Sequence, residues 1–179
     1  VSGYTNIVLT ARLSSTSVVP GNGAEINDLV RFYIASNGGA FPGTADITVT
    51  GASANNARWG YATGTGVATT SAGTPATFTP AGSGNRTTDG YSYISITIPG
   101  SPNSIALRVN AVNNNADERW NIDDIQITGD YCSTVYYSRA DGNVGDAIWS
   151  ETPSGTAGSV TFDRFKSMVV QNGDVVAIN

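Results

Sequence analysis

Two acidic pairs are the residues of this chain best suited to chemistry. Glu25 and Asp28 precede an apolar stretch, and Asp123 and Asp124 are adjacent in a later one. Carboxylates are the hard oxygen donors that calcium requires, together with backbone carbonyls. If the strands that carry the pairs are neighbours, the four side chains form a structural Ca²⁺ site. The alternative is that they are solvated turn residues and caps of an irregular strand. A further acidic patch, Asn115, Asp117 and Glu118, is interpreted as a solvated turn.

The second pair also interrupts a strand pattern. The apolar residues around it are Trp120, Ile122, Ile125 and Ile127. The first two share one face of a strand, and the last two share the other. Since side chains alternate faces along a strand, this change of phase predicts an irregularity at Asp123 and Asp124. A β-bulge is the simplest one, because it adds a residue to one strand.

Catalysis is not expected from these residues. The chain contains no histidine, so it can form neither a Ser-His-Asp triad nor a histidine-ligated zinc site. Glycosidases hold two carboxylates about 5–10 Å apart across the substrate, and neighbouring residues of a strand do not. Cys132 is the only cysteine, so no internal disulfide forms, and no histidine activates it. We therefore predict that the protein is not an enzyme.

Aromatic residues form a second group of candidates. Exposed rings stack on sugars, and nearby polar groups fix the orientation of the sugar. The candidate ligand-binding residues are Arg58, Trp59, Tyr61, Tyr91 and Tyr93. The alternative for Trp59 is a place in the core, and the two later tyrosines either cover a second layer or are exposed. This group makes a carbohydrate-binding module the alternative function.

The amino-acid composition limits the classes of partner that the chain is expected to bind. Net charge is −5, the sequence pI is about 4.4, and Lys166 is the only lysine. Binding to nucleic acid requires a basic patch, so neither nucleic acid nor an anionic membrane surface is an expected partner. No run of 18 apolar residues occurs, which argues against membrane insertion. An acidic, lysine-poor chain rich in Thr, Asn and Gly is typical of a secreted, extracellular or cell-surface protein.

Period-2 patterns predict an all-β chain. Roughly eight strands separated by Gly, Asn and Pro turns are expected from residue 5 to residue 129, with no helix. This spacing favours an antiparallel jelly-roll β-sandwich over residues 1–129, with a barrel as the alternative. Most of residues 62–89 is interpreted as a surface loop.

Residues 130–179 are predicted to be a small β extension or the start of a second module. Fifty residues bury little core, and apolar strand edges pair with other chains. The candidate assembly residues are Val169, Val170, Val175, Val176 and Ile178. The expected partners are other protein chains, through self-assembly or neighbouring modules, or surface glycans.

Two stretches resemble known proteins. Residues 1–129 are similar to jelly-roll modules of large secreted bacterial surface proteins, and distantly to MAM-type domains. Glu25 and Asp28 before the 29–34 strand, and Trp-x-Ile-Asp-Asp-Ile-x-Ile-Thr-Gly at 120–129, carry this resemblance. Tyr-Tyr-Ser-Arg-Ala-Asp-Gly-Asn at 136–143, and Val-Val-x-Asn-Gly-Asp-Val-Val at 169–176, resemble module openings in surface proteins that use type IX secretion. The resemblance implies a surface location and an adhesive or structural function. The secretion domain of such proteins is not seen, so we expect a fragment or another use of the modules.

Overall fold

The computed structural model describes residues 1–52, 55–80, 84–86, 90–131, 134–162 and 166–178. Within these ranges it contains β-strands and no helix, so the prediction of an all-β chain is confirmed. It follows that no helix in the described ranges is long and apolar enough to cross a membrane. The chain divides into two compact units, unit 1 from Val1 to Asp130 and unit 2 from Tyr131 to Asn179.

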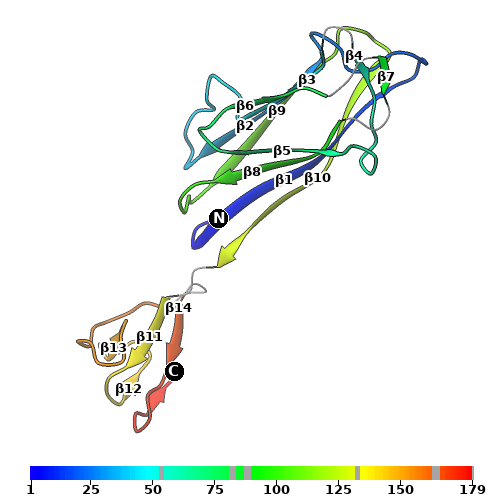
Figure 1. Cartoon of the computed structure of the whole chain (residues 1–179). Helices are drawn as coiled ribbons and strands as arrows, with labels where there is room; N and C mark the ends of the chain where they lie inside the picture. The colour runs from blue at the N-terminus through cyan, green and yellow to red at the C-terminus, as the bar shows by residue number, and fades with distance from the viewer. Residues whose placement is uncertain (53–54, 81–83, 87–89, 132–133, 163–165, 179) are drawn as a thin grey trace. The chain divides into compact units, whose positions relative to one another are not determined.

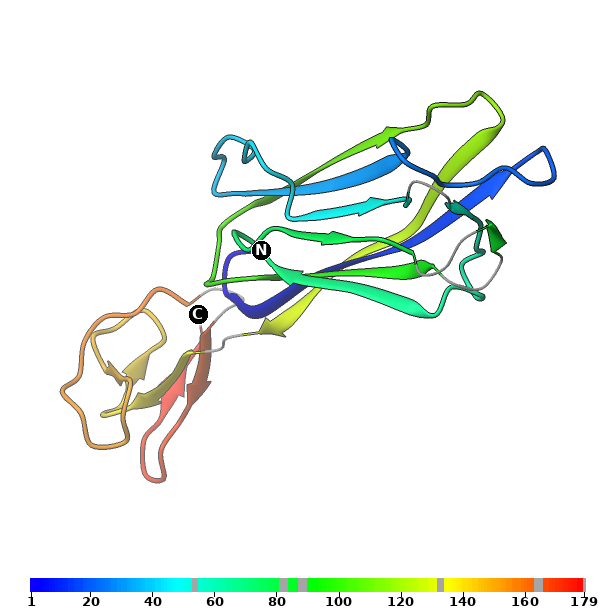
Figure 2. The same ribbon diagram turned by 45° about the horizontal axis from the view of Figure 1, so that its top comes forward.

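Unit 1 is built from two four-stranded sheets and a small two-stranded one (Figures 1 and 2). Its strands are β1 (Tyr4–Ser17), β2 (Leu29–Ser36), β3 (Ile47–Thr50), β4 (Asn55–Ala57), β5 (Gly66–Ser71), β6 (Ala76–Phe78), β7 (Gly84–Arg86), β8 (Tyr91–Ile98), β9 (Ile105–Val112) and β10 (Glu118–Tyr131). The order is β10-β1-β8-β5 in one large sheet and β6-β3-β2-β9 in the other. The small sheet pairs β4 with β7.

The core of unit 1 lies between the two large sheets. It follows from the alternation of apolar side chains, since one face of each central strand is buried. The buried residues include Ile7, Leu9, Ala11 and Leu13 of β1, Val30, Phe32 and Ile34 of β2, Ile47 and Val49 of β3, and Ile94, Ile96 and Ile98 of β8. Each of the larger side chains contributes about 1.5–3 kcal/mol of burial free energy.

The first and last strands of unit 1 are neighbours in one sheet. Near one end of the pair, Asn6 Nδ2 donates a hydrogen bond to Asp130 Oδ2 at 2.7 Å. Near the other end, Asn121 Nδ2 donates to Ser14 Oγ at 3.1 Å. β1 and β10 therefore run in opposite directions, and the chain enters and leaves unit 1 at the same end of this pair.

Parallel pairing distinguishes this fold from the antiparallel jelly roll that the sequence predicts. β3 pairs with β6, β4 with β7 and β5 with β8, all in parallel. Each of the strands β3, β4 and β5 thus lies beside the strand three elements later, as in successive turns of a β-solenoid. The side-chain alternation of a strand does not report the direction of its neighbour, so the sequence pattern could not reveal these pairs.

β5 lies in the segment that the sequence analysis interprets as a surface loop, so that interpretation is wrong here. Its alternate residues Ala68 and Thr70 are buried against β8, and Val67 is exposed. The alternation is present, but a small residue and a polar one mark the buried face. Gly66 allows the close approach, because a Cβ there would lie 2.6 Å from the Tyr91 ring.

Unit 2 repeats the parallel winding on a smaller scale. Its strands are β11 (Thr134–Ser138), β12 (Gly142–Asn143), β13 (Trp149–Ser150), β14 (Lys166–Val169) and β15 (Val176–Ala177). β11 pairs in parallel with β14, and β12 pairs in parallel with β15. The small core centres on Trp149, which is 1% exposed and meets the Phe162 ring edge-on at 4.8 Å.

Candidate metal centre

A tight turn places Glu25 and Asp28 at the start of β2. The backbone N–H of Asp28 donates to the Glu25 carbonyl at 3.1 Å, and Asn27 between them has φ +77°. Asn is one of the few residues that tolerates this left-handed conformation. Asp28 is fully buried, and its Oδ2 accepts the Glu25 backbone N–H at 2.9 Å. The turn therefore fixes both carboxylates relative to β2.

The polar turn between β9 and β10 lies against this first turn. The backbone N–H of Asn114 donates to Asp28 Oδ1 at 2.7 Å, and its Nδ2 donates to Glu25 Oε1 at 3.3 Å. Asn113 Nδ2 donates to the Glu118 carbonyl at 2.9 Å, at the first residue of β10. These bonds bring Glu118 to Glu25 and Asp28 across a long separation in sequence.

The three carboxylates converge on one point. One oxygen each from Glu25, Asp28 and Glu118 lies within 4.8 Å of the others. Glu118 is 4% exposed, and its Oε2 is buried with no hydrogen-bond partner among the described residues. An unsatisfied buried polar atom costs about 1–3 kcal/mol, and more when it is charged. A cation bound by the three groups would remove this cost and their mutual repulsion.

The pKa of Glu118 also indicates that its negative charge is unfavourable at this position. Burial raises the pKa of Glu118 above its ordinary value, and the charges of Asp28 and then Glu25 raise this pKa further. A hydrogen bond from the Asn115 backbone opposes the rise in pKa. A bound divalent cation reverses this balance, because it favours the ionised carboxylate. Ca²⁺ fits the donor set, since it takes six to eight oxygen ligands in flexible geometry.

A glycine of β3's C-terminal end leaves room for the first turn. A Cβ at Gly51 would lie 2.4 Å from the Glu25 carbonyl oxygen. The neighbouring Thr50 donates its hydroxyl to the Asp28 carbonyl at 3.0 Å. The end of β3 therefore packs directly beneath the acidic group and supports it.

The irregularity predicted at Asp123 and Asp124 is present, but these residues do not join the acidic group. Asp124 has φ +49°, and its N–H donates to Asp123 Oδ1 at 2.8 Å. Both carboxylates are exposed. Glu118 takes their place in the group, although the sequence analysis assigns it to a solvated turn. A signal existed, because Glu118 shares the strand face of Trp120 and Ile122, which pack on the core.

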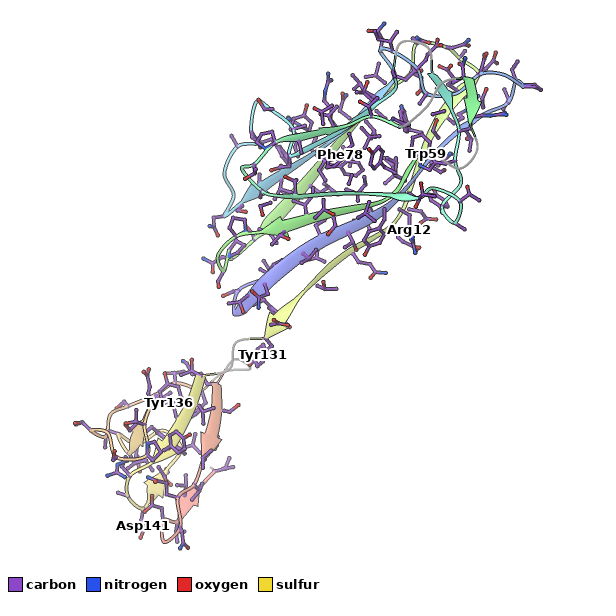
Figure 3. The ribbon with its side chains drawn as sticks, viewed as in Figure 1. Arg12, Trp59, Phe78, Tyr131, Tyr136 and Asp141 are labelled. Atoms are coloured by element: carbon purple, nitrogen blue, oxygen red, sulfur yellow. The ribbon has the colours of Figure 1, made fainter. Side chains whose placement is uncertain are left out.

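The proposed sugar-binding aromatics have protein partners. Trp59 is 1% exposed, donates its indole N–H to the Leu13 carbonyl at 3.0 Å and points into unit 1 (Figure 3). It therefore offers no face to a sugar. Tyr91 meets the Phe78 ring edge-on at 5.3 Å, and Arg12 lies 5.1 Å above the Tyr93 ring. Tyr61 and Arg58 are both partly exposed, and Arg58 lines a pocket with Trp59.

The candidate assembly residues are mostly exposed. Val169 and Val170 are exposed at the end of β14, and Val175 is 70% exposed just before β15. Ile178 is 80% exposed, whereas Val176 is half-buried in β15. No protein-family model, no curated protein and no solved structure matches the chain.

Proposed function

We propose that this chain is a non-enzymatic, calcium-stabilised module of a secreted bacterial cell-surface protein, with a structural or adhesive function. The convergence of Glu25, Asp28 and Glu118 carries this proposal, together with a buried oxygen of Glu118 that has no hydrogen-bond partner among the described residues. Extracellular modules bind calcium with dissociation constants of about 10⁻⁴–10⁻³ M, so structural calcium suits an exported protein. The sequence motif on β10, which resembles one in secreted bacterial surface proteins, supports the surface location, although the parallel strand pairs of unit 1 differ from a jelly roll.

Calcium would stabilise unit 1 by joining segments that are far apart in sequence. Glu25 and Asp28 belong to the turn before β2, whereas Glu118 begins the last strand. The unfolded chain cannot hold these groups together, so the ion binds the folded state selectively. Such binding adds about 2.7 kcal/mol to the free energy of unfolding when the ion is at 100 times its dissociation constant.

Adding about 10 mM CaCl₂, which is 100 times a dissociation constant of about 10⁻⁴ M, to chelator-stripped protein is expected to raise the melting temperature of unit 1 by about 5–10 °C. The estimate combines that stabilisation with a shift of about 2–4 °C per kcal/mol for a domain of this size. Scanning calorimetry with and without CaCl₂ measures the shift, and choline chloride at equal ionic strength is the control. An unchanged melting temperature at this CaCl₂ concentration would contradict the proposal.

Exposed apolar residues of unit 2 support assembly with a second copy of the chain. Val169 and Val170 are exposed at one end of β14, and Met168 beside them is 38% exposed. Contiguous apolar patches mark interaction surfaces, and strand edges pair with strands of other chains. Pairing of two β14 segments around a two-fold axis would bury these side chains in both copies.

The intact chain is therefore expected to elute as a dimer or larger at tens of micromolar, and Val169→Lys is expected to return it to a monomer. A lysine on a strand edge opposes pairing, because pairing would bury its charge. Light scattering coupled to size exclusion gives the mass. Val67→Lys, at an exposed position of β5, is the matched control and should not change it. A monomeric wild-type chain would remove the assembly proposal and leave the calcium proposal standing.

A further inference from the structure

A pocket of about 440 Å³ lies in unit 1 where the end of β1 meets the segment after β4. Its volume falls within the usual range for small-molecule sites, about 300–1,000 Å³. The described lining residues are Ser15, Thr16, Ser17, Arg58, Trp59, Gly60 and Thr63. Ser15 and Trp59 exchange backbone hydrogen bonds of 3.1 and 2.9 Å, which hold the two walls together. The pocket is therefore formed on paired backbone and does not need a ligand to shape it.

Arg58 is the charged group of this pocket. Its Nε is buried and has no hydrogen-bond acceptor among the described residues. The aliphatic part of the Arg58 side chain passes over Gly23. A Cβ at Gly23 would lie 2.7 Å from Arg58 Cγ, so only glycine allows this side-chain position. A planar guanidinium binds a carboxylate through two parallel hydrogen bonds. No carboxylate in the described part of the chain pairs with Arg58, so the part of its guanidinium that lines the pocket is available to an anionic ligand.

The hydroxyl groups around Arg58 are arranged as acceptors. Ser15 Oγ donates its hydrogen to the Ala57 carbonyl at 3.1 Å, and Ser17 Oγ donates to the Val19 carbonyl at 3.2 Å. Thr16 Oγ1 accepts a hydrogen from Asn121 Nδ2 at 3.0 Å. Ser17 Oγ also accepts the Val19 backbone N–H at 3.2 Å, so it keeps one lone pair for a donor on a ligand, whereas Ser15 Oγ keeps two. A bare anion supplies no donors, whereas a sugar ring carries several hydroxyl groups.

We propose that this pocket binds an acidic saccharide, a sugar that carries a carboxylate, such as a hexuronate residue of a polysaccharide. Arg58 binds the carboxylate, and the serine oxygens of β1 accept hydrogen bonds from ring hydroxyls. Trp59 forms a wall through its buried ring and does not stack on the sugar as an exposed platform. This proposal is independent of the calcium site, because none of its residues belongs to the acidic group.

The test is a titration of the intact chain with D-glucuronate, D-glucose and acetate, followed by NMR. Glucuronate is expected to shift the Trp59 indole and Gly60 amide resonances and to bind at least about tenfold more tightly than glucose or acetate, which is about 1.4 kcal/mol. Acetate binding as tightly as glucuronate would overturn the proposal, since the sugar ring would then contribute nothing. The absence of binding by glucuronate would also overturn it.

Variants assign the binding to Arg58. Arg58→Gln is expected to weaken glucuronate binding at least about tenfold. Arg58→Lys keeps the positive charge but cannot form the two parallel hydrogen bonds of a guanidinium, so it is expected to give an intermediate loss of affinity. Arg12→Gln, on the outer face of β1, is the matched control with unchanged binding. If Arg58→Gln fails to fold, Arg58→Lys decides the question. Wild-type affinity in a folded Arg58 variant, or equal losses in the Arg12 control, would overturn the proposal.

Discussion

Replacing Trp59 with alanine is expected to lower the free energy of unfolding of unit 1 by about 3–5 kcal/mol, the usual cost of removing a buried tryptophan. The ring is 1% exposed and meets the Trp120 ring edge-on at 5.7 Å. Its fit is tight, because a Cβ at Gly90 would lie 2.1 Å from Trp59 Cδ2. Alanine would leave a cavity and would strip the Leu13 carbonyl of its hydrogen bond. Urea unfolding followed by circular dichroism measures the change.

Trp149→Ala is the matched control for this experiment. Trp149 is also 1% exposed, but it packs within unit 2 against Phe162. Its loss is therefore expected to affect the unfolding of unit 2 and to leave the transition of unit 1 in place. A loss below about 1 kcal/mol in Trp59→Ala would contradict the core position, because exposed substitutions cost about that or less.

Replacing Glu118 with glutamine is expected to change the stability of unit 1 in opposite directions with and without calcium. Without calcium, the variant removes a charge from beside Asp28 and Glu25 and gains about 0.5–1.5 kcal/mol. With saturating calcium, it loses most of the roughly 2.7 kcal/mol that the ion contributes. Denaturant unfolding of both proteins in CaCl₂ and in chelator gives the four free energies. Asp117→Asn, at the neighbouring acid outside the group of three carboxylates, should show no such crossing.

In the absence of calcium, the stability of the wild-type protein has a pH dependence that the same variant lacks. The pKa of Glu118 is raised in the folded state above its ordinary 4.5, chiefly by burial. The folded state therefore binds this proton more tightly than the unfolded chain does. The contribution of Glu118 to stability falls as pH rises from 4.5 through the raised value, and Glu118→Gln lacks this fall. A wild-type minus variant difference that is flat from pH 4.5 to 7 would contradict the assignment.

Local features of the fold could be predicted from the sequence, and long-range pairing could not. Ile7, Leu9 and Ala11 share one face of a period-2 pattern, and this pattern predicts the buried face of β1. The change of apolar phase predicts an irregularity at Asp123 and Asp124, and the structure shows one, with φ +49° at Asp124. The parallel partner of β5 depends on the path of the chain between strands, which side-chain alternation does not encode. β5 was not predicted as a strand because its buried face carries a small residue, Ala68, and a polar one, Thr70.

Two of the three residues of the acidic group were predicted for the same reason. Glu25 and Asp28 stand together before a strand, and their spacing is local. Glu118 is brought to them by the Asn114 bonds, which join two turns distant in sequence. Asp123 and Asp124 have the right chemistry, but they lie farther along β10 on exposed positions. Residue type identifies possible ligands, whereas the strand register decides which of them meet.

The pairing of β1 with β10 determines how unit 1 responds to mechanical load. Asn6 and Asp130 mark the end of this antiparallel pair where the chain enters and leaves the unit. Tension between those two points separates the strands from that end, so the hydrogen bonds break one after another and do not resist together in shear. Glu118 lies at the far end of β10, so calcium would hold the last section to open. Under tension between these two points, such a unit would open from this end first and keep the end that carries Glu118 folded longest.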